Sequence, residues 1–125
     1  MDESNRTPHP GRGEGLSEDY ANNTAFEATV WDLKLIFGEW SQRTGSVEWH
    51  TSITVSWAQA KLLNHFLAVN IAAHEIVNGK IRVPDSALPA PVAPPSGEVT
   101  DAKAPEVFKM FQEQRESFLR SLKDP

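Results

Sequence analysis

Residues Val55–Gly79 form the stretch that most limits what this chain can fold into. Ser56 and Gln59 have the spacing of an N-terminal capping box, and Asn78-Gly79 supplies a stop signal. We therefore predict a helix of about 21 residues, about 30 Å long. Its apolar side chains span nearly half of the circumference, more than the stripe of somewhat over 100° that a surface helix needs. The centre of this apolar arc consists of Ala58, Leu62, Phe66, Val69, Ala73 and Ile76.

Alternation of apolar and polar residues before this helix predicts three β-strands. The first begins near Phe26 and the second includes Leu35, with a tight turn around Trp31-Asp32 between them. We predict that residues 38–46 connect the second strand to the third. The third strand should place one set of side chains on a single face: Val47, Trp49, Thr51, Ile53 and Val55. The short connections favour an antiparallel meander.

These elements predict an α+β fold: a three-stranded antiparallel meander, then one long helix packed on the sheet, and a tethered C-terminal amphipathic helix. Residues 1–19 are polar and aperiodic and should form a disordered tail. Residues 20–83 make the β-β-β-α core domain, and residues 84–103 a stiff, Pro-rich linker. Residues 104–123 have apolar side chains at helical spacing.

Composition argues against several classes of function. The 125 residues include no cysteine, which excludes disulfide and thiolate chemistry. Residues 20–83 carry five acidic and five basic side chains, so they lack the basic stripe of a nucleic-acid binder. His74-Glu75 begins like a zinc-protease helix, but the second histidine of that motif is absent. No nucleophile, base and acid are grouped as in an active site. We therefore predict a non-enzymatic protein with no metal and no cofactor.

The middle of the chain resembles a known family. The resemblance covers about residues 20–82, and the residues that carry it are Tyr20 and Asn22, Leu35-Ile36-Phe37-Gly38, Ser56, Ala60, Lys61, Leu63, Glu75, Gly79 and Ile81. This pattern is similar to a family of small bacterial and archaeal proteins classified only as a domain of unknown function. Trp57 stands where that family often has proline, and His74 where it has an aromatic residue. The resemblance implies a β-β-β-α unit and no catalytic residues. The order of elements also resembles that of the bacterial export chaperones, which assemble into tetramers.

The wide apolar arc predicts a protein-interaction or assembly module, because three short strands cannot cover it. We expect a homo-oligomer, formed through the helix face or through an unprotected strand edge. The candidate interface residues are Leu63, Leu67, Asn70 and His74 on the helix flank, with Phe108, Phe111 and Phe118 on the last helix. Trp31, Trp40 and Trp57 are candidate exposed aromatic contacts, since they have no place on the predicted apolar faces.

Two alternatives remain open. The same surfaces would suit a holdase-like chaperone subunit that binds unfolded apolar segments, and a small-ligand or nucleic-acid binder ranks third. The partner is expected to be a second copy or another protein. The last helix could dock in cis, swap between copies or bind a partner. The N-terminus lacks the pattern of a signal peptide and no segment has the length to cross a bilayer, so we expect no membrane association and a cytoplasmic location.

Overall fold

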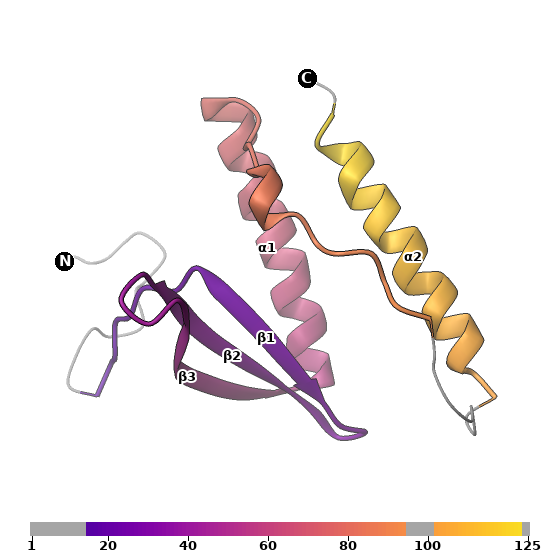
Figure 1. The fold of residues 1–125 in the computed structure, drawn as a ribbon, viewed down its shortest axis with the longest axis horizontal. Coiled ribbons are helices and arrows are strands. Elements are labelled where there is room, and N and C mark those ends of the chain that lie inside the picture. Colours follow the sequence, from indigo (N-terminus) through magenta and orange to yellow (C-terminus); the bar gives the residue numbers. More distant parts are fainter. Residues whose placement is uncertain (1–14, 95–101, 124–125) are drawn as a thin grey trace. The chain divides into compact units, whose positions relative to one another are not determined.

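The computed structural model describes residues 15–94 and 102–123. Three strands come first, followed by a long helix, a single 3-10 turn and a second long helix (Figure 1). Their bounds are β1 Asn23–Ala28, β2 Asp32–Ser41, β3 Ser46–Ser56, α1 Trp57–Asn78, η1 Asp85–Ala87 and α2 Ala104–Ser121. The α+β class, the order of the elements and the antiparallel meander are therefore confirmed.

The chain divides into two compact units, residues 1–67 and 68–125, so the boundary lies inside α1. The first unit contains the sheet and the N-terminal half of α1. The second contains the C-terminal half of α1, η1 and α2. The predicted boundaries at 19/20, 83/84 and 103/104 stay predictions, and most of the predicted N-terminal tail lies outside the described residues.

The sheet has the order β1-β2-β3, with both pairs antiparallel (Figure 1). A two-residue hairpin, Val30-Trp31, joins β1 to β2. Thr29 closes it: its amide donates to the carbonyl of Asp32 (2.9 Å), and its hydroxyl accepts from the amides of Trp31 and Asp32 (3.0 Å each). Side chains that hydrogen-bond the nearby backbone replace the Asn-Gly that such turns often use.

The register places most of the apolar side chains on one face. Phe26 is paired with Leu35, and Leu35 with Ile53, so all three project to the same side. Leu33, Phe37 and Val55 belong to this same face, which we call the Leu35 face. Leu35, with 7% of its surface exposed, is the only large hydrophobic side chain that is buried in the described part of the chain. It lies on the central strand, where both neighbouring strands cover it.

A β-bulge interrupts the pairing of β2 with β3. Phe37 is opposite Thr51 and Gly38 is opposite Trp49, which leaves His50 as the extra residue. Phe37 and Gly38 are consecutive and project to opposite faces, so Trp49 lies on the face opposite Ile53. The prediction that Trp49 shares a face with Ile53 is wrong, because the bulge shifts the alternation by one residue.

Gly38 is required by this arrangement. A Cβ atom at Gly38 would lie 2.7 Å from the Glu48 carbonyl oxygen and 2.8 Å from both the Trp49 Cε3 and the Val47 Cγ1 atoms. The absence of a side chain thus lets Trp49 pack over the β2 backbone. β2 continues through Gly38 to Ser41, so the predicted connection at residues 38–46 is longer than the turn that the structure contains.

β3 continues into α1 without a loop. The hydroxyl of Ser56 accepts from the amide of Gln59 (3.1 Å), which confirms the predicted cap at the start of the helix. At the other end, Gly79 has φ of 93° and its amide donates to the Glu75 carbonyl (2.9 Å). This left-handed glycine ends the helix where the sequence predicts.

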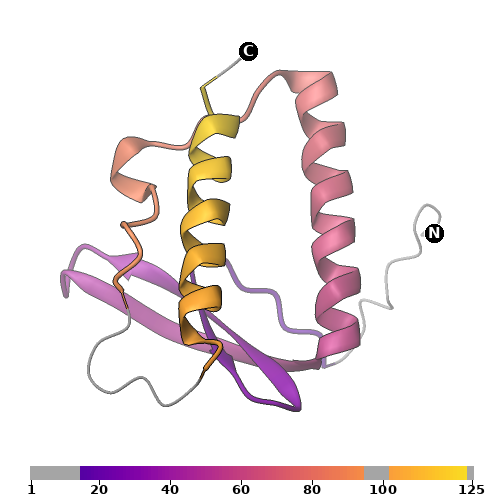
Figure 2. The same cartoon turned by 90° about the vertical axis from the view of Figure 1, so that its right-hand side faces the viewer.

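The segment after α1 is extended up to η1. The carboxylate of Glu75 accepts from the amide of Ile81 (3.0 Å) and holds the chain where it leaves the helix. Further on, the Arg115 Nε of α2 donates to the Pro89 carbonyl (3.0 Å), so the described residues just after η1 run beside α2 (Figures 1 and 2). Pro105 lies in the first turn of α2, where its missing amide costs no helical hydrogen bond.

Candidate interaction surfaces

Helix α1 contains no buried residue, although it is apolar around much of its circumference. In the central stripe, the exposed fractions of Phe66 and Ile76 are 55% and 85%. Leu62 and Val69 of the same stripe are also exposed. A globular domain normally buries such an arc against another element. The structure therefore leaves the predicted arc available for contact.

The predicted helix-flank residues share one side of α1. Leu63 is half-buried, whereas Leu67, Asn70 and His74 are exposed. Ile71 belongs to this flank as well, since it lies four residues after Leu67. The sequence reasoning missed Ile71, although its helical spacing was a sufficient signal. The His74 Nδ1 atom contacts the Asn78 side-chain amide, 3.3 Å away.

A hollow lies within the second unit, on the side of α1 that carries Ala68, Ala72 and Glu75, and Ile71 borders it. Its volume is about 470 Å³. Most of its lining is apolar, and the residues around it are Ala68, Ile71, Ala72, Glu75, Lys80, Ile81, Val83, Phe118, Ser121 and Leu122. Of the three predicted phenylalanines of the last helix, Phe118 lines the hollow. Phe108 is half-buried, and Phe111 is exposed.

The hairpin between β1 and β2 carries the most exposed aromatic side chain. Val30 and Trp31 form its tip, with exposed fractions of 85% and 82%. Trp57 lies beside the same hairpin, because its indole Nε1 donates to the Thr29 carbonyl (3.0 Å). Trp31 and Trp57 thus both lie at the hairpin end of the sheet. Trp57 remains partly exposed.

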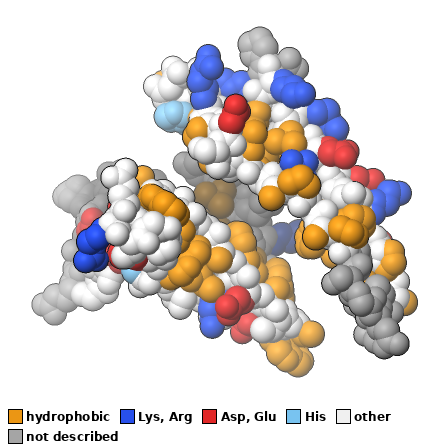
Figure 3. All heavy atoms as spheres, in the orientation of Figure 1, with side chains coloured by type: hydrophobic (Ala, Val, Ile, Leu, Met, Phe, Trp, Pro, Cys, Tyr) orange, Lys and Arg blue, Asp and Glu red, His pale blue; other side chains and the backbone are white. Residues whose placement is uncertain are grey.

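The face opposite Leu35 carries a second aromatic cluster. Trp40 is paired with Val47 and Trp49 with Gly38, so the two indoles are on one side of the sheet. Both are about half exposed, at 51% and 49%. Trp49 was not among the predicted surface aromatics, since its place depends on the bulge at His50. Figure 3 shows how hydrophobic side chains gather on the visible surface of the described residues.

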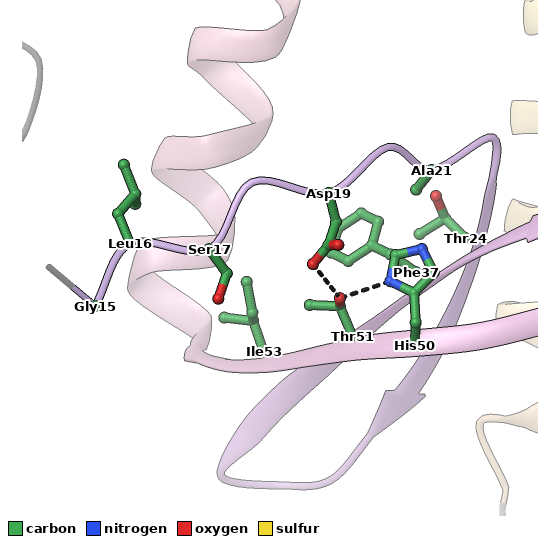
Figure 4. A pocket seen from close by; sticks show the side chains of 10 residues that line it. All are labelled: Gly15, Leu16, Ser17, Asp19, Ala21, Thr24, Phe37, His50, Thr51 and Ile53. Atoms are coloured by element: carbon green, nitrogen blue, oxygen red, sulfur yellow. Dashed lines mark hydrogen bonds between the residues drawn. The ribbon is translucent and has the colours of Figure 1, made fainter. Parts of the chain in front are cut away.

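Residues Gly15–Ala21 cross the Leu35 face near the bulge and leave a hollow of about 690 Å³ (Figure 4). Phe37, Ile53 and Leu16 supply apolar lining. A chain of polar contacts borders the hollow. The His50 ring contacts the Tyr20 carbonyl through Nε2 (3.0 Å) and the Thr51 hydroxyl through Nδ1 (2.7 Å).

The same chain of contacts ends on a carboxylate. The Thr51 hydroxyl lies 3.4 Å from an oxygen of Asp19, and Figure 4 shows the dashed contacts of Thr51 with both Asp19 and His50. The Thr51 hydroxyl, which also contacts the His50 ring, donates to Asp19. These groups fasten the N-terminal segment to the sheet. The sequence reasoning did not find them, because residues 19 and 51 are far apart in the chain and His50 reaches this face only through the bulge.

Neither a metal centre nor a membrane-crossing helix occurs in the part of the chain that the structure describes. Residues 15–94 and 102–123 contain no group of three or more His, Asp or Glu side chains that could hold a metal ion. In the same residues, neither long helix combines the length with the apolar character that crossing a bilayer requires.

Comparisons with protein-family models, with curated proteins and with solved structures give no match. The resemblance to a small bacterial and archaeal family, and the likeness to the export chaperones, therefore stay predictions. The candidate surfaces stand on the geometry alone.

Proposed function

We propose that this protein is a non-enzymatic interaction module that self-associates, and that association covers the apolar surfaces that one chain leaves open. The observation that carries the proposal is that Leu35 is the only large hydrophobic side chain buried in the described residues. Removing apolar surface from water contributes about 25 cal/mol per Å², and it is the main term that offsets the entropy lost on folding. A chain of this size with so little buried apolar surface gains much of its stability when a second copy covers more of it.

Helix α1 is the main contact surface in this proposal. Its exposed stripe is long, continuous and free of charged side chains from Leu62 to Ala73. A second helix of the same kind could pack its own stripe against this one, as in helical bundles. The predicted flank, with Leu67, Asn70 and His74, would border the contact, and its polar groups would fix the register of the two helices.

Light scattering after size-exclusion chromatography tests this proposal on the full chain. We expect a mass that is a multiple of 13.9 kDa at micromolar concentration. Phe66→Glu should lower this mass, because it places a charge at the centre of the stripe. Asn64→Glu adds the same charge on the polar side of α1 and is the matched control, which should leave the mass unchanged. A wild-type particle of 13.9 kDa at every concentration would show that the proposal is wrong.

The last helix supplies a second apolar surface. Val107, Met110 and Phe111 on α2 are exposed, and they recur at the three- and four-residue spacing of one helix face. Phe111→Glu should weaken association if α2 joins the contact between copies. Glu113→Gln is its control on the polar side. An unchanged mass with Phe111→Glu would limit the interface to α1 and the sheet.

One observation favours a holdase-like activity as the second candidate. The Val30-Trp31 tip exposes two apolar side chains on a rigid hairpin, which suits contact with an unfolded apolar segment. The protein should then suppress the aggregation of an unrelated denatured protein, and Trp31→Ser should reduce that effect. Equal suppression by Trp31→Ser would argue against the hairpin as the contact. A cytoplasmic location completes the proposal and follows from the sequence prediction.

A further inference from the structure

The outer side of β3 is the longest open strand edge in the described part of the molecule. β2 is the central strand, and no described strand lies beyond β3. β3 has 11 residues, whereas the other edge strand, β1, has 6. One side of β3 pairs with β2 along its whole length. The backbone groups on its other side are therefore open to a further strand.

The pairing identifies the residues that face this open side. The Thr29 amide donates to the Asp32 carbonyl, so Asp32 directs its backbone groups toward β1. The direction of the backbone N–H and C=O groups alternates along a strand. Leu33 and Leu35 therefore direct these groups toward β3, where they bond to Val55 and Ile53. On β3, the backbone groups of the residues that alternate with Val55 and Ile53 therefore point away from β2. Ser52 and Thr54 present N–H and C=O groups to the open edge.

The open edge lacks the features that normally prevent strands from pairing. Natural edge strands carry lysine, proline or inward-pointing charges. Residues 51–56 read Thr-Ser-Ile-Thr-Val-Ser, with no proline and no charged side chain. The bulge at His50 limits regular pairing on the N-terminal side of this segment. The stretch from Thr51 to Ser56 is thus the part of the edge that is suited to pairing.

We propose that residues Thr51–Ser56 pair in antiparallel fashion with the same segment of a second copy, about a twofold axis that passes beside Ile53. In this register Ser52 pairs with Thr54 of the partner subunit, and about four backbone hydrogen bonds form. Ile53 then lies opposite Ile53 of the partner subunit, and Thr51 opposite Val55 of the partner subunit. This inference rests on the proposed self-association and adds a strand-edge contact to the one through α1.

The occupant is a second copy because the segment is complementary to itself. With no charged side chain in residues 51–56, two copies meet without repulsion between like charges. A twofold axis perpendicular to the sheet keeps both Leu35 faces on the same side. The half-exposed Ile53 would therefore gain an apolar neighbour directly across the axis. A register in which Ser52 pairs with itself would place Ile53 opposite Thr51 instead, with less apolar contact.

A single-cysteine experiment tests the contact directly, because the natural chain contains no cysteine. Ile53 directs its backbone groups toward β2, so two facing copies of it form a non-hydrogen-bonded pair with Cα atoms about 4.5 Å apart. This separation falls within the range of disulfide bonds. Ile53→Cys should form a disulfide-linked dimer under mild oxidation. Gln42→Cys, in the exposed turn after β2, is the control and should cross-link much more slowly.

Two further variants test the register. An equal mixture of Thr51→Cys and Val55→Cys chains should give the mixed dimer, whereas each chain alone should cross-link poorly. Thr54→Pro removes an outward amide without breaking the pairing with β2, and it should abolish cross-linking of Ile53→Cys. Circular dichroism of each variant establishes that it has folded. The mixed-dimer assay also serves as the second test if Ile53→Cys fails to fold.

The outcomes separate this inference from the proposed function. If folded Ile53→Cys cross-links no faster than Gln42→Cys and the mixture gives no mixed dimer, the proposed edge contact is wrong. Light scattering on the same samples then reports on association itself. A dimeric mass without cross-linking would keep the proposed function and overturn only the edge contact. A monomeric mass would overturn both.

Discussion

Gly38→Ala should destabilise the fold, because the position has no room for a methyl group. The new Cβ would lie under 3.0 Å from three atoms, and one of them is the Glu48 carbonyl oxygen, which belongs to the backbone of the paired strand. A flexible side chain could rotate away, but a paired backbone cannot move without loosening the ladder. Overpacking of this kind typically costs about 1–3 kcal/mol. We therefore expect a loss of about 2 kcal/mol, or roughly 8–16 °C in melting temperature for a domain of this size.

Urea unfolding followed by far-ultraviolet circular dichroism measures this loss. The protein concentration must be the same for all variants, because association adds to the apparent stability. Gly45→Asn is the control: Gly45 has φ of 69°, which asparagine tolerates, and no atom lies near its added Cβ, so the loss should stay below about 1 kcal/mol.

A double-variant cycle locates the clash. Trp49→Ala removes the indole that lies over Gly38, so Gly38→Ala should cost less in that background than in the natural chain. Some cost should remain, because the Glu48 carbonyl stays in place. An unchanged unfolding midpoint for Gly38→Ala in the natural chain would refute the packing of Trp49 over β2, and the position of the bulge with it.

Three further predictions concern single hydrogen bonds. Trp57→Phe should lower the free energy of unfolding by about 1 kcal/mol, because the indole no longer donates to the Thr29 carbonyl, and Trp40→Phe should cost less in the same urea titration. Ser56→Ala should cost about 1 kcal/mol through loss of the helix cap, whereas Ser52→Ala, on the exposed face of β3, should leave the unfolding midpoint nearly unchanged; equal losses would contradict the capping role. Glu75→Ala should speed amide hydrogen exchange at Ile81, because the Ile81 amide loses its acceptor. Glu75→Gln keeps an acceptor oxygen and should exchange more slowly than Glu75→Ala. Equal rates in both variants would show that the carboxylate does not hold Ile81.

Local signals explain what the sequence predicted well. The start and end of α1 depend on Ser56 and Gly79, each of which acts on backbone groups within one turn. The three strands follow from alternation, which any half-buried strand must show. The hairpin position was predicted one residue late, because its turn is stabilised by the Thr29 and Asp32 side chains rather than by glycine.

The bulge in β3 could not be predicted from the alternation of its residues. Val47, Trp49, Thr51 and Ile53 alternate without interruption in the sequence, although the structure places the first two on one face and the last two on the other. The cause lies on a different strand, where Gly38 leaves room for the indole. The pattern of residues along one strand does not show where the neighbouring strand lacks a side chain. The contacts of His50 with Tyr20 and Thr51 depend on the same bulge and were hidden for the same reason.

Because β3 runs directly into α1, the direction of the helix is coupled to the direction of the strand. With the strand ending at Ser56 and the helix beginning at Trp57, no loop is present to absorb a change in strand direction. The helix has 22 residues, a length of about 33 Å. A tilt of about 10° at the junction would therefore swing its far end by about 6 Å. Any event that twists the last residues of β3 becomes a movement of several ångströms at Asn78.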